Sequence, residues 1–268
     1  MISLTHRLVS VLLFLCFLVL PCLVAAQSPP DDKKFIDDTK NAYSMLRRQG
    51  LAEITATVLP NWDLAFAELE RAKRPEAMAL TNRLRFSLFA DSNGTVRVTH
   101  TVVGPKMTGT KAQALKTIAT GVELSVTGFL MSWMPFMMTY LIPDTLDQFV
   151  LQDLKSAYLL TFTEKTVEVG VKVTRDFVIT ELTTPQGSVK PTLFRSKTGF
   201  VLTGYEAINE DPVVGKIVLR AKIDSAPIRG MLLPRSVSLI GSVAEKTFNL
   251  KFLFTNYKLK TNPIAQGK

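Results

Sequence analysis

Val167-Glu168-Val169-Gly170-Val171-Lys172-Val173-Thr174 is the clearest of several alternating runs that decide the fold of this chain. Its valines stand at every second position, and a period of two places them on one face of a pleated strand. The same alternation recurs in Lys216 to Ile223 and in Thr247 to Thr255. We therefore predict that Ser156 to Leu259 forms one large antiparallel sheet with an apolar face.

Turn residues separate these runs, as expected for strands that follow one another in a meander. The predicted turns are Thr184-Pro185-Gln186-Gly187, Ser196 to Gly199, Asn209 to Pro212, Arg229-Gly230 and Gly241-Ser242. Helical patterns occupy much of the preceding half of the chain. The predicted fold class is therefore α+β, with one large antiparallel sheet whose apolar face other elements must cover.

Residues 1–26 are typical of a secretory signal peptide. Arg7 precedes an apolar run from Leu8 to Leu20, and Val24-Ala25-Ala26 suits a cleavage site. An uncleaved anchor is the alternative, because Leu8 to Ala26 is just long enough to span a bilayer. Cleavage near Ala26 predicts a periplasmic or secreted protein.

Once this segment is removed, the mature chain has few reactive side chains. Cys16, Cys22 and His6 all lie within it, so the mature chain keeps His100 as its one histidine. This composition excludes a disulfide framework, a thiol nucleophile and a Cys/His zinc site. No carboxylate pair belongs to a recognisable motif, and no glycine loop is of the phosphate-binding kind. We predict a protein that is not an enzyme and has no cofactor, metal site or catalytic residue.

The chain is basic, with 32 Lys+Arg against 23 Asp+Glu and a net charge of +9. Its basic residues are scattered singly, and it has neither a basic helix nor the motif of an RNA-binding module, so we expect no nucleic-acid partner. A solvated cationic surface is the simplest interpretation. Peripheral contact with an anionic membrane is the second.

The N-terminal half alternates between helical and strand patterns. After a mobile lead-in at 27–34, we predict a helix at Phe35 to Gln49, a strand at Leu51 to Val58, a helical stretch at Asp63 to Met78 interrupted at Pro75, and a hairpin formed by Arg83 to Ala90 and Thr95 to Val103. Asn93-Gly94 supplies the hairpin turn. His100 lies on the apolar side of the second hairpin strand, which favours a core or cavity histidine over a catalytic one.

Lys111 to Pro143 is the most unusual stretch, because its apolar residues keep helical spacing throughout. From Gly128 onward the polar face nearly vanishes, and four methionines lie close to Trp133. We expect Pro135 to kink this helix and Pro143 to end it. A further short helix, capped by Asp144 and running to Leu154, is predicted to lead into the sheet.

Three interpretations of this helix remain open. It fills a core, covers a cavity as a mobile lid, or inserts into a membrane. Flexible methionine side chains suit a surface that accepts apolar shapes of different kinds. On the lid interpretation, the ligand-binding residues are Phe129, Met131, Trp133, Met134, Phe136, Met137, Met138, Tyr140 and Leu141.

Short motifs near the end of the chain resemble the periplasmic lipoprotein-carrier superfamily, the LolA/LolB-like half-barrel. Gly230-Met231-Leu232-Leu233-Pro234-Arg235 is similar to the start of one family strand, and Phe252 to Tyr257 is similar to the closing strand with its Asn-Tyr tail. Thr198-Gly199-Phe200 resembles a turn two strands earlier. The resemblance implies an unclosed sheet that curves around lid helices and holds acyl chains. It also implies a single domain at 35–260, with a helical insertion at 106–155 and a tail at 261–268.

The expected function follows from this resemblance and from the methionine-rich helix. We expect a binding protein that shelters an apolar lipid or a lipoprotein acyl chain between sheet and helix, in envelope lipid or lipoprotein transport. The alternative is a non-catalytic envelope scaffold whose apolar helix only fills its own core.

Overall fold

The computed structural model describes residues 31–139, 141–143, 148–164, 166–211, 215–243 and 246–263. The predicted signal peptide, residues 27–30 of the predicted lead-in and residues 264–268 of the predicted tail lie outside the described residues. The chain divides into two units, Met1–Phe35 and Ile36–Lys268. The second unit contains the sheet and is the one described below.

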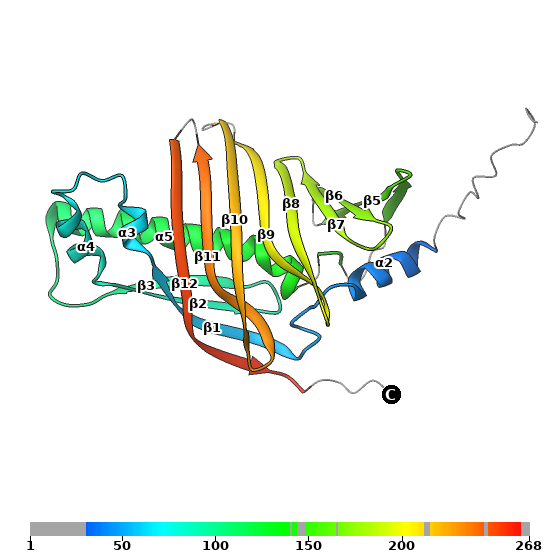
Figure 1. Cartoon of the computed structure of the whole chain (residues 1–268), viewed down its shortest axis with the longest axis horizontal. Coiled ribbons are helices and arrows are strands. Elements are labelled where there is room, and N and C mark those ends of the chain that lie inside the picture. Colours follow the sequence, from blue (N-terminus) through cyan, green and yellow to red (C-terminus); the bar gives the residue numbers. More distant parts are fainter. Residues whose placement is uncertain are drawn as a thin grey trace, which may run out of the picture. The chain divides into compact units, whose positions relative to one another are not determined.

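Twelve strands form one antiparallel sheet in the order β3-β2-β1-β12-β11-β10-β9-β8-β7-β6-β5-β4 (Figure 1). The strands are β1 Leu51–Pro60, β2 Leu84–Asp91, β3 Val96–Val102, β4 Phe149–Asp153, β5 Ala157–Glu164, β6 Val167–Thr174, β7 Ile179–Thr184, β8 Gly187–Ser196, β9 Gly199–Asp211, β10 Gly215–Ile228, β11 Met231–Val243 and β12 Lys246–Thr261. The helices are α2 Asp32–Asn41, α3 Trp62–Ala65, α4 Arg74–Thr81 and α5 Gly109–Met137. All sheet neighbours are consecutive in the chain except β1 and β12, which join the first hairpin to the long meander.

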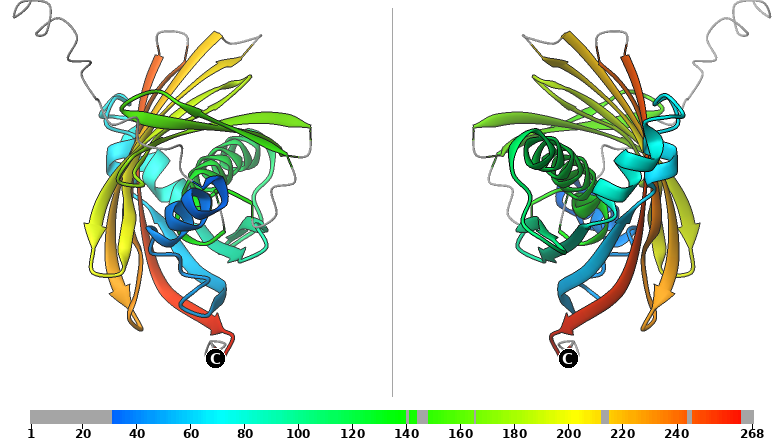
Figure 2. Two further views of the ribbon diagram at one scale, coloured as in Figure 1. Left: turned by 90° about the vertical axis from the view of Figure 1, so that its right-hand side faces the viewer. Right: turned by 90° about the vertical axis from the view of Figure 1, so that its left-hand side faces the viewer.

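The sheet curves around helix α5, which lies on its concave side (Figure 2). Strands β3 and β4 are the two ends of the sheet and do not pair with each other, so the sheet is not closed into a barrel. This confirms the predicted fold class, an α+β structure with a large, unclosed, curved antiparallel sheet.

Alternating burial along the strands follows the alternating sequence. Val171 and Val173 of β6 are fully buried, as are Phe252 and Phe254 of β12, whereas Leu253 between them is exposed on the other face. The predicted hairpin is also confirmed, because β2 and β3 pair in register from Leu84 to Ala90. The apolar face that the sequence predicts is therefore the concave face, which packs against α5.

Helix α5 buries one side from Leu115 onward and nearly its whole circumference near its end. Phe129, Trp133 and Phe136 are almost completely buried, and the ring of Phe129 lies 5.9 Å from that of Phe254 on β12. Lys111, Lys116 and other polar residues of the first half face solvent. The predicted amphipathic helix is confirmed. It ends at Met137, however, and not at Pro143 as predicted.

The N-terminal helix is shorter than predicted, because α2 ends at Asn41 instead of Gln49. The next residues bind the sheet: Ala42 O accepts a hydrogen bond from Phe200 N at 2.8 Å, and Ser44 N donates to Phe200 O at 3.0 Å. A parallel bridge between Tyr43 and Phe200 results. Backbone groups that bind Phe200 cannot also continue the α2 hydrogen-bond ladder, so the helix stops.

Three further predictions of local structure are wrong. Phe149 to Asp153 is strand β4 rather than part of a short helix, because it pairs with β5; the predicted cap Asp144 lies outside the described residues. Pro75 lies in the first turn of α4, which begins at Arg74, instead of interrupting a longer helix; this position suits a residue without a backbone N–H. Gly241-Ser242 is not a turn but part of β11, where Gly241 pairs with Phe248.

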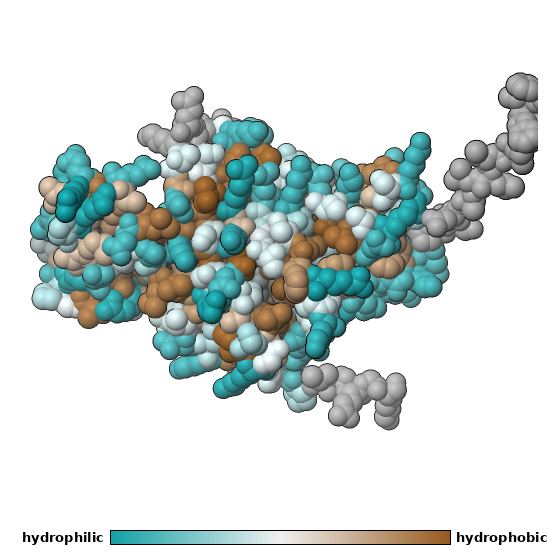
Figure 3. Space-filling view, in the orientation of Figure 1, coloured by the Kyte–Doolittle hydropathy of each residue, from teal (hydrophilic) through white to brown (hydrophobic). Residues whose placement is uncertain are grey.

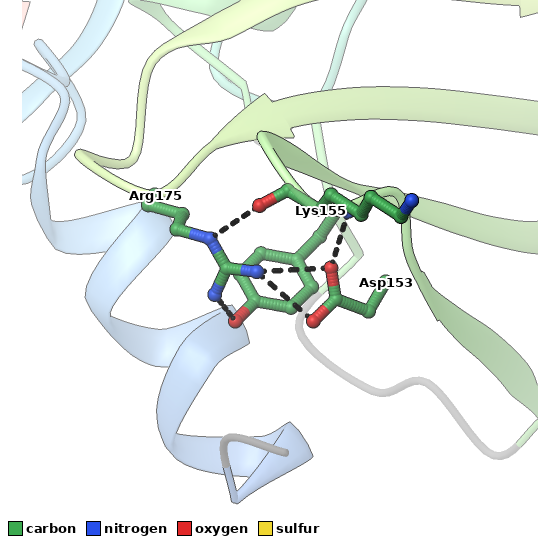
Figure 4. Close-up of polar contacts among 4 residues, drawn as sticks. Asp153, Lys155 and Arg175 are labelled. Atoms are coloured by element: carbon green, nitrogen blue, oxygen red, sulfur yellow. Dashed lines mark hydrogen bonds and ion pairs between the residues drawn. The ribbon is translucent and has the colours of Figure 1, made fainter. Parts of the chain in front are cut away.

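Arg175, in the turn between β6 and β7, fastens edge strand β4 to β5 and to that turn (Figure 4). The Arg175 guanidinium donates to both carboxylate oxygens of Asp153, at 2.9 and 3.0 Å, and to Lys155 O at 2.9 Å. It also donates to the Tyr158 hydroxyl and lies over the Tyr158 ring, with its central carbon 4.7 Å from the ring centroid. A planar, multiply bonded guanidinium of this kind fixes geometry better than a single ion pair does.

Hydrophobic patches lie among hydrophilic ones on the side of the unit seen in Figure 3. Leu59 and Leu253, which pair across β1 and β12, are each 42% exposed, and Phe194 is 60% exposed. Small groups of exposed apolar side chains are common on protein surfaces, so these carry no functional argument.

Candidate functional site

The predicted lid residues lie in the second half of α5 and in the turn that follows it. Most of them are buried: Phe129, Trp133, Met134, Phe136, Met137 and Met138. Met131 points away from the interior and is 57% exposed, and Leu141 is half-buried. Tyr140 lies outside the described residues. The structure therefore gathers six of the nine predicted residues in the interior, between α5 and the sheet.

The end of α5 is bound to two other parts of the unit through Met137. Its carbonyl accepts a hydrogen bond from Leu46 N at 2.7 Å, and its sulfur accepts a weak one from Leu202 N at 3.4 Å. Met138 N and Thr139 N both donate to Met134 O at 2.8 Å, which ends the helix. These few bonds, together with side-chain packing, hold the apolar end of α5 against the sheet.

A small cavity remains at this end of α5. Its volume is about 20 Å³, and Tyr43, Met45, Phe136, Leu141, Ile142 and Ile179 contribute to its lining. A cavity needs roughly 10–15 Å³ to hold one water molecule. This cavity holds about one water molecule, so an acyl chain would fit at this end of α5 only if the helix moved.

Two tyrosine hydroxyls lie buried near the helix. The Tyr43 hydroxyl accepts a hydrogen bond from Ile179 N at 2.7 Å, and burial raises the pKa of Tyr43 well above its usual value. Burial also raises the pKa of Tyr205, and the neighbouring Ser132 hydroxyl opposes that rise. Ser132, however, donates to Gly128 O at 3.1 Å, and the Tyr205 hydroxyl has no contact of hydrogen-bond geometry among the described residues.

A larger groove, which the sequence reasoning missed, lies between edge strand β3 and the first half of α5. This β3–α5 groove has a volume of about 390 Å³. Its lining includes apolar Val102, Met107 and Leu115 and cationic Lys106 and Lys116. The loop residues 103–108 carry no periodic signal, so only the folded arrangement brings them beside β3 and α5.

His100 lines the same groove. Its Nδ1 lies 2.8 Å from Glu123 Oε1 on α5, and its side chain is 27% exposed. The ring centroid of His100 is 6.1 Å from that of Phe86. His100 is thus a hydrogen-bonded histidine in a groove wall that links β3 to α5, in keeping with the cavity alternative of the sequence prediction.

A third hollow, of about 580 Å³, is mainly polar and lies beside the start of β1 and the end of β12. Arg47, Arg48, Asp91 and the paired Glu53 and Lys260 line it; Lys260 Nζ lies 2.7 Å from Glu53 Oε1. A mainly polar lining with charges of both signs does not suit an acyl chain.

No cluster of three or more histidine, cysteine, aspartate or glutamate side chains suited to a metal ion occurs in the part of the chain that the structure describes. Within that same part, no helix combines the length and the hydropathy needed to cross a bilayer. Comparison with models of known protein families, with curated proteins and with solved structures finds no match to this chain.

Proposed function

We propose that this chain is a binding protein of the cell envelope that shelters an apolar lipid or a lipoprotein acyl chain between the curved sheet and helix α5. In this proposal it acts in lipid or lipoprotein transport, in the periplasm or outside the cell after signal-peptide cleavage. One observation carries the proposal: a helix end that is apolar nearly all round lies on the concave face of a sheet with two free edges.

The way in which α5 is held supports movement of this helix. Apart from side-chain packing, the second half of α5 is held to the other described residues by the two hydrogen bonds that Met137 accepts and, at the middle of the helix, by the contact of Glu123 with His100. Because β3 and β4 do not pair with each other, α5 could shift toward the open side without breaking the strand ladder. An acyl chain would then replace the contacts that the helix gives up.

The proposed driving force is removal of acyl methylenes from water. Each buried methylene contributes about 0.8 kcal/mol, so a chain of ten or so methylenes would offset the cost of moving a well-packed helix. The buried methionines, Met134, Met137 and Met138, suit this exchange, because flexible thioether side chains repack against apolar surfaces of different shape.

A scaffold without ligand is the second candidate, and the packed interior favours it. With a cavity of only about 20 Å³ at the end of α5, the helix fills its own core in the described conformation. On this alternative, Trp133 and the buried methionines only stabilise the sheet.

Native mass spectrometry of the protein purified from its own envelope tests the two candidates. The proposal expects co-purified acyl lipid that is released on denaturation and exchanges with added lipid. Protein that is free of lipid, and that binds no fluorescent acyl probe, would leave the scaffold as the function.

A further inference from the structure

The β3–α5 groove has the size of a ligand site. Its 390 Å³ falls within the range of about 300–1,000 Å³ that is typical of small-molecule pockets. It is distinct from the cavity at the other end of α5, because its α5 residues, Ala112, Leu115 and Lys116, belong to the first half of the helix. The headgroup of an acyl ligand could therefore occupy this groove while its chain runs along α5.

The floor of the groove is apolar and partly uncovered. Leu115 is buried, whereas Val102, on the outermost strand of the sheet, is 45% exposed. Met107 lies beside them and is half-buried. Hydrocarbon laid along this floor would be removed from water together with the surface it covers, which is favourable.

The loop that forms one wall is held in place by Arg83. The Arg83 Nε donates to Val103 O at 2.8 Å, and the guanidinium also donates to Pro105 O. Between these two residues Gly104 has a φ of 93°, in the left-handed region that glycine adopts most readily. A wall fixed before binding lowers the entropic cost of forming a complex.

The charge that remains at the groove is positive. Lys106 and Lys116 have no ion-pair partner within the described ranges of the chain. Lys111, on the first turn of α5, differs, because Glu76 lies 2.8 Å from its ammonium group. The carboxylate of Glu123 is likewise in contact with His100. The two free ammonium groups are therefore complementary to an anion.

The geometry points to the β3–α5 groove as the binding site for the anionic headgroup of an acyl lipid, with a terminal carboxylate between Lys106 and Lys116 and the first methylenes over Val102 and Leu115. This inference rests on the proposed function and narrows its ligand to an anionic amphiphile such as a long-chain fatty acid. A lipoprotein acyl chain, which ends in an amide or an ester, would not use these lysines.

The test compares two charge-matched double variants of the full chain. Lys106→Gln with Lys116→Gln removes the proposed headgroup contacts. Lys197→Gln with Lys258→Gln removes two exposed lysines that do not line the groove. The probes are a fluorescent long-chain fatty acid and its methyl ester, which has the same chain without the charge.

We expect the first double variant to bind the fatty acid about tenfold more weakly than the parent, because two exposed charge contacts are lost. The second should bind it as the parent does. The methyl ester should bind all three proteins alike and more weakly than the acid binds the parent. Raising the salt concentration should weaken binding of the acid only.

The contrary outcomes separate the two proposals. Equal affinity of the parent for acid and ester, with no loss in the first double variant, would overturn the groove assignment and leave acyl binding in place. Failure of the parent to bind either probe would remove the proposed function and this inference together. Binding to phosphatidylglycerol vesicles that needs Lys106 and Lys116, without binding of monomeric probe, would show a membrane-docking surface and overturn the assignment too.

Discussion

The backbone carbonyl of Met137, the last residue of α5, accepts a hydrogen bond from the amide of Leu46 at 2.7 Å. This bond joins the most apolar part of the helix to the turn that precedes β1. It is one of the few polar contacts that hold the end of α5, so it lies where opening of a lid would begin.

The first prediction separates a lid from a core. Met137→Asp places a charge at a position that is 1% exposed. In a rigid core an unpaired buried charge costs several kcal/mol of unfolding free energy. If α5 is a lid, the helix end can open and expose the charge to water, so the unfolding free energy should fall by less than about 3 kcal/mol while binding of a fluorescent acyl probe is lost.

Met131→Asp on the same helix is the control, because Met131 is 57% exposed. It should change the unfolding free energy by less than about 0.5 kcal/mol and leave probe binding near that of the parent. Global unfolding of Met137→Asp, together with a parent protein that binds no acyl probe, would reject the lid and support the scaffold.

The second prediction concerns the buried hydroxyl of Tyr205. Burial raises its pKa, so the folded state keeps the proton at a pH where the unfolded state, with a pKa near 10, has lost it. The buried tyrosine therefore leaves the unfolding free energy unchanged below pH 10. Above pH 10 the unfolding free energy falls by up to about 1.4 kcal/mol per pH unit for each such tyrosine. Tyr205→Phe should lessen this alkaline loss.

At neutral pH the same variant should be as stable as the parent or slightly more stable, because it removes a buried hydroxyl that has no hydrogen-bond partner among the described residues. Tyr43→Phe provides the contrast, since it leaves the amide of Ile179 without its acceptor and should be destabilising. Chemical denaturation between pH 7 and pH 11 measures both. A loss of stability in Tyr205→Phe at pH 7 would show that its hydroxyl is hydrogen-bonded in solution.

The third prediction addresses the fastening of edge strand β4. Arg175→Lys keeps the positive charge but cannot bind Asp153, Lys155 O and Tyr158 at once. Amide hydrogen exchange should therefore become faster in β4, with little change in β10 and β11. The hydrogen bond from Lys155 N and the Arg175 guanidinium also lower the pKa of Asp153, so this fastening is fully present above the usual carboxyl pKa and is lost as the pH falls through the lowered pKa. Exchange in β4 that is unaffected by the substitution would contradict this role.

The fourth prediction compares two strand glycines. An added Cβ at Gly204 would lie 2.6 Å from the backbone oxygen of Ala221, which cannot move without disturbing the pairing of β9 with β10. The three atoms nearest to an added Cβ at Gly241 all belong to the ring of Phe248, which is 37% exposed and can turn outward. Gly204→Ala should therefore destabilise the protein by about 1–3 kcal/mol and Gly241→Ala by less than about 1 kcal/mol. Thermal unfolding of the two variants checks the order, and the reverse order would refute this reasoning.

Periodicity in the sequence determined most of the secondary structure. The alternating valines of β6 and the alternating Phe252 and Phe254 of β12 predict strands with one buried face, and Val171, Val173 and both phenylalanines are buried. The helical spacing from Lys111 onward predicts α5, and its buried residues follow that spacing. Such patterns are readable because the face on which a side chain lies depends on its own position in a strand or helix.

Burial within the predicted lid could be foreseen only in part. The loss of polar residues after Gly128 predicts that the end of α5 is covered on most sides, and Phe129, Trp133 and Phe136 are buried. The exposure of Met131 could not be predicted from composition, since it depends on which side of α5 the sheet leaves uncovered. The β3–α5 groove was missed for a similar reason, because Lys106 and Lys116 come from a loop and a helix that meet only in the folded chain.

The ends of elements and the order of the strands were decided by the tertiary structure. Helix α2 stops at Asn41 because Ala42 and Ser44 bind the backbone of Phe200, more than a hundred residues away. Phe149 to Asp153 becomes a strand because its backbone pairs with the free edge of β5. Strand β1 pairs with β12, although nearly the whole described sequence separates them. The sequence by itself determined which faces are apolar, since that depends on neighbours along the chain. Only the folded structure decided where the backbone hydrogen bonds go, because each N–H and C=O takes the partner that folding brings to it.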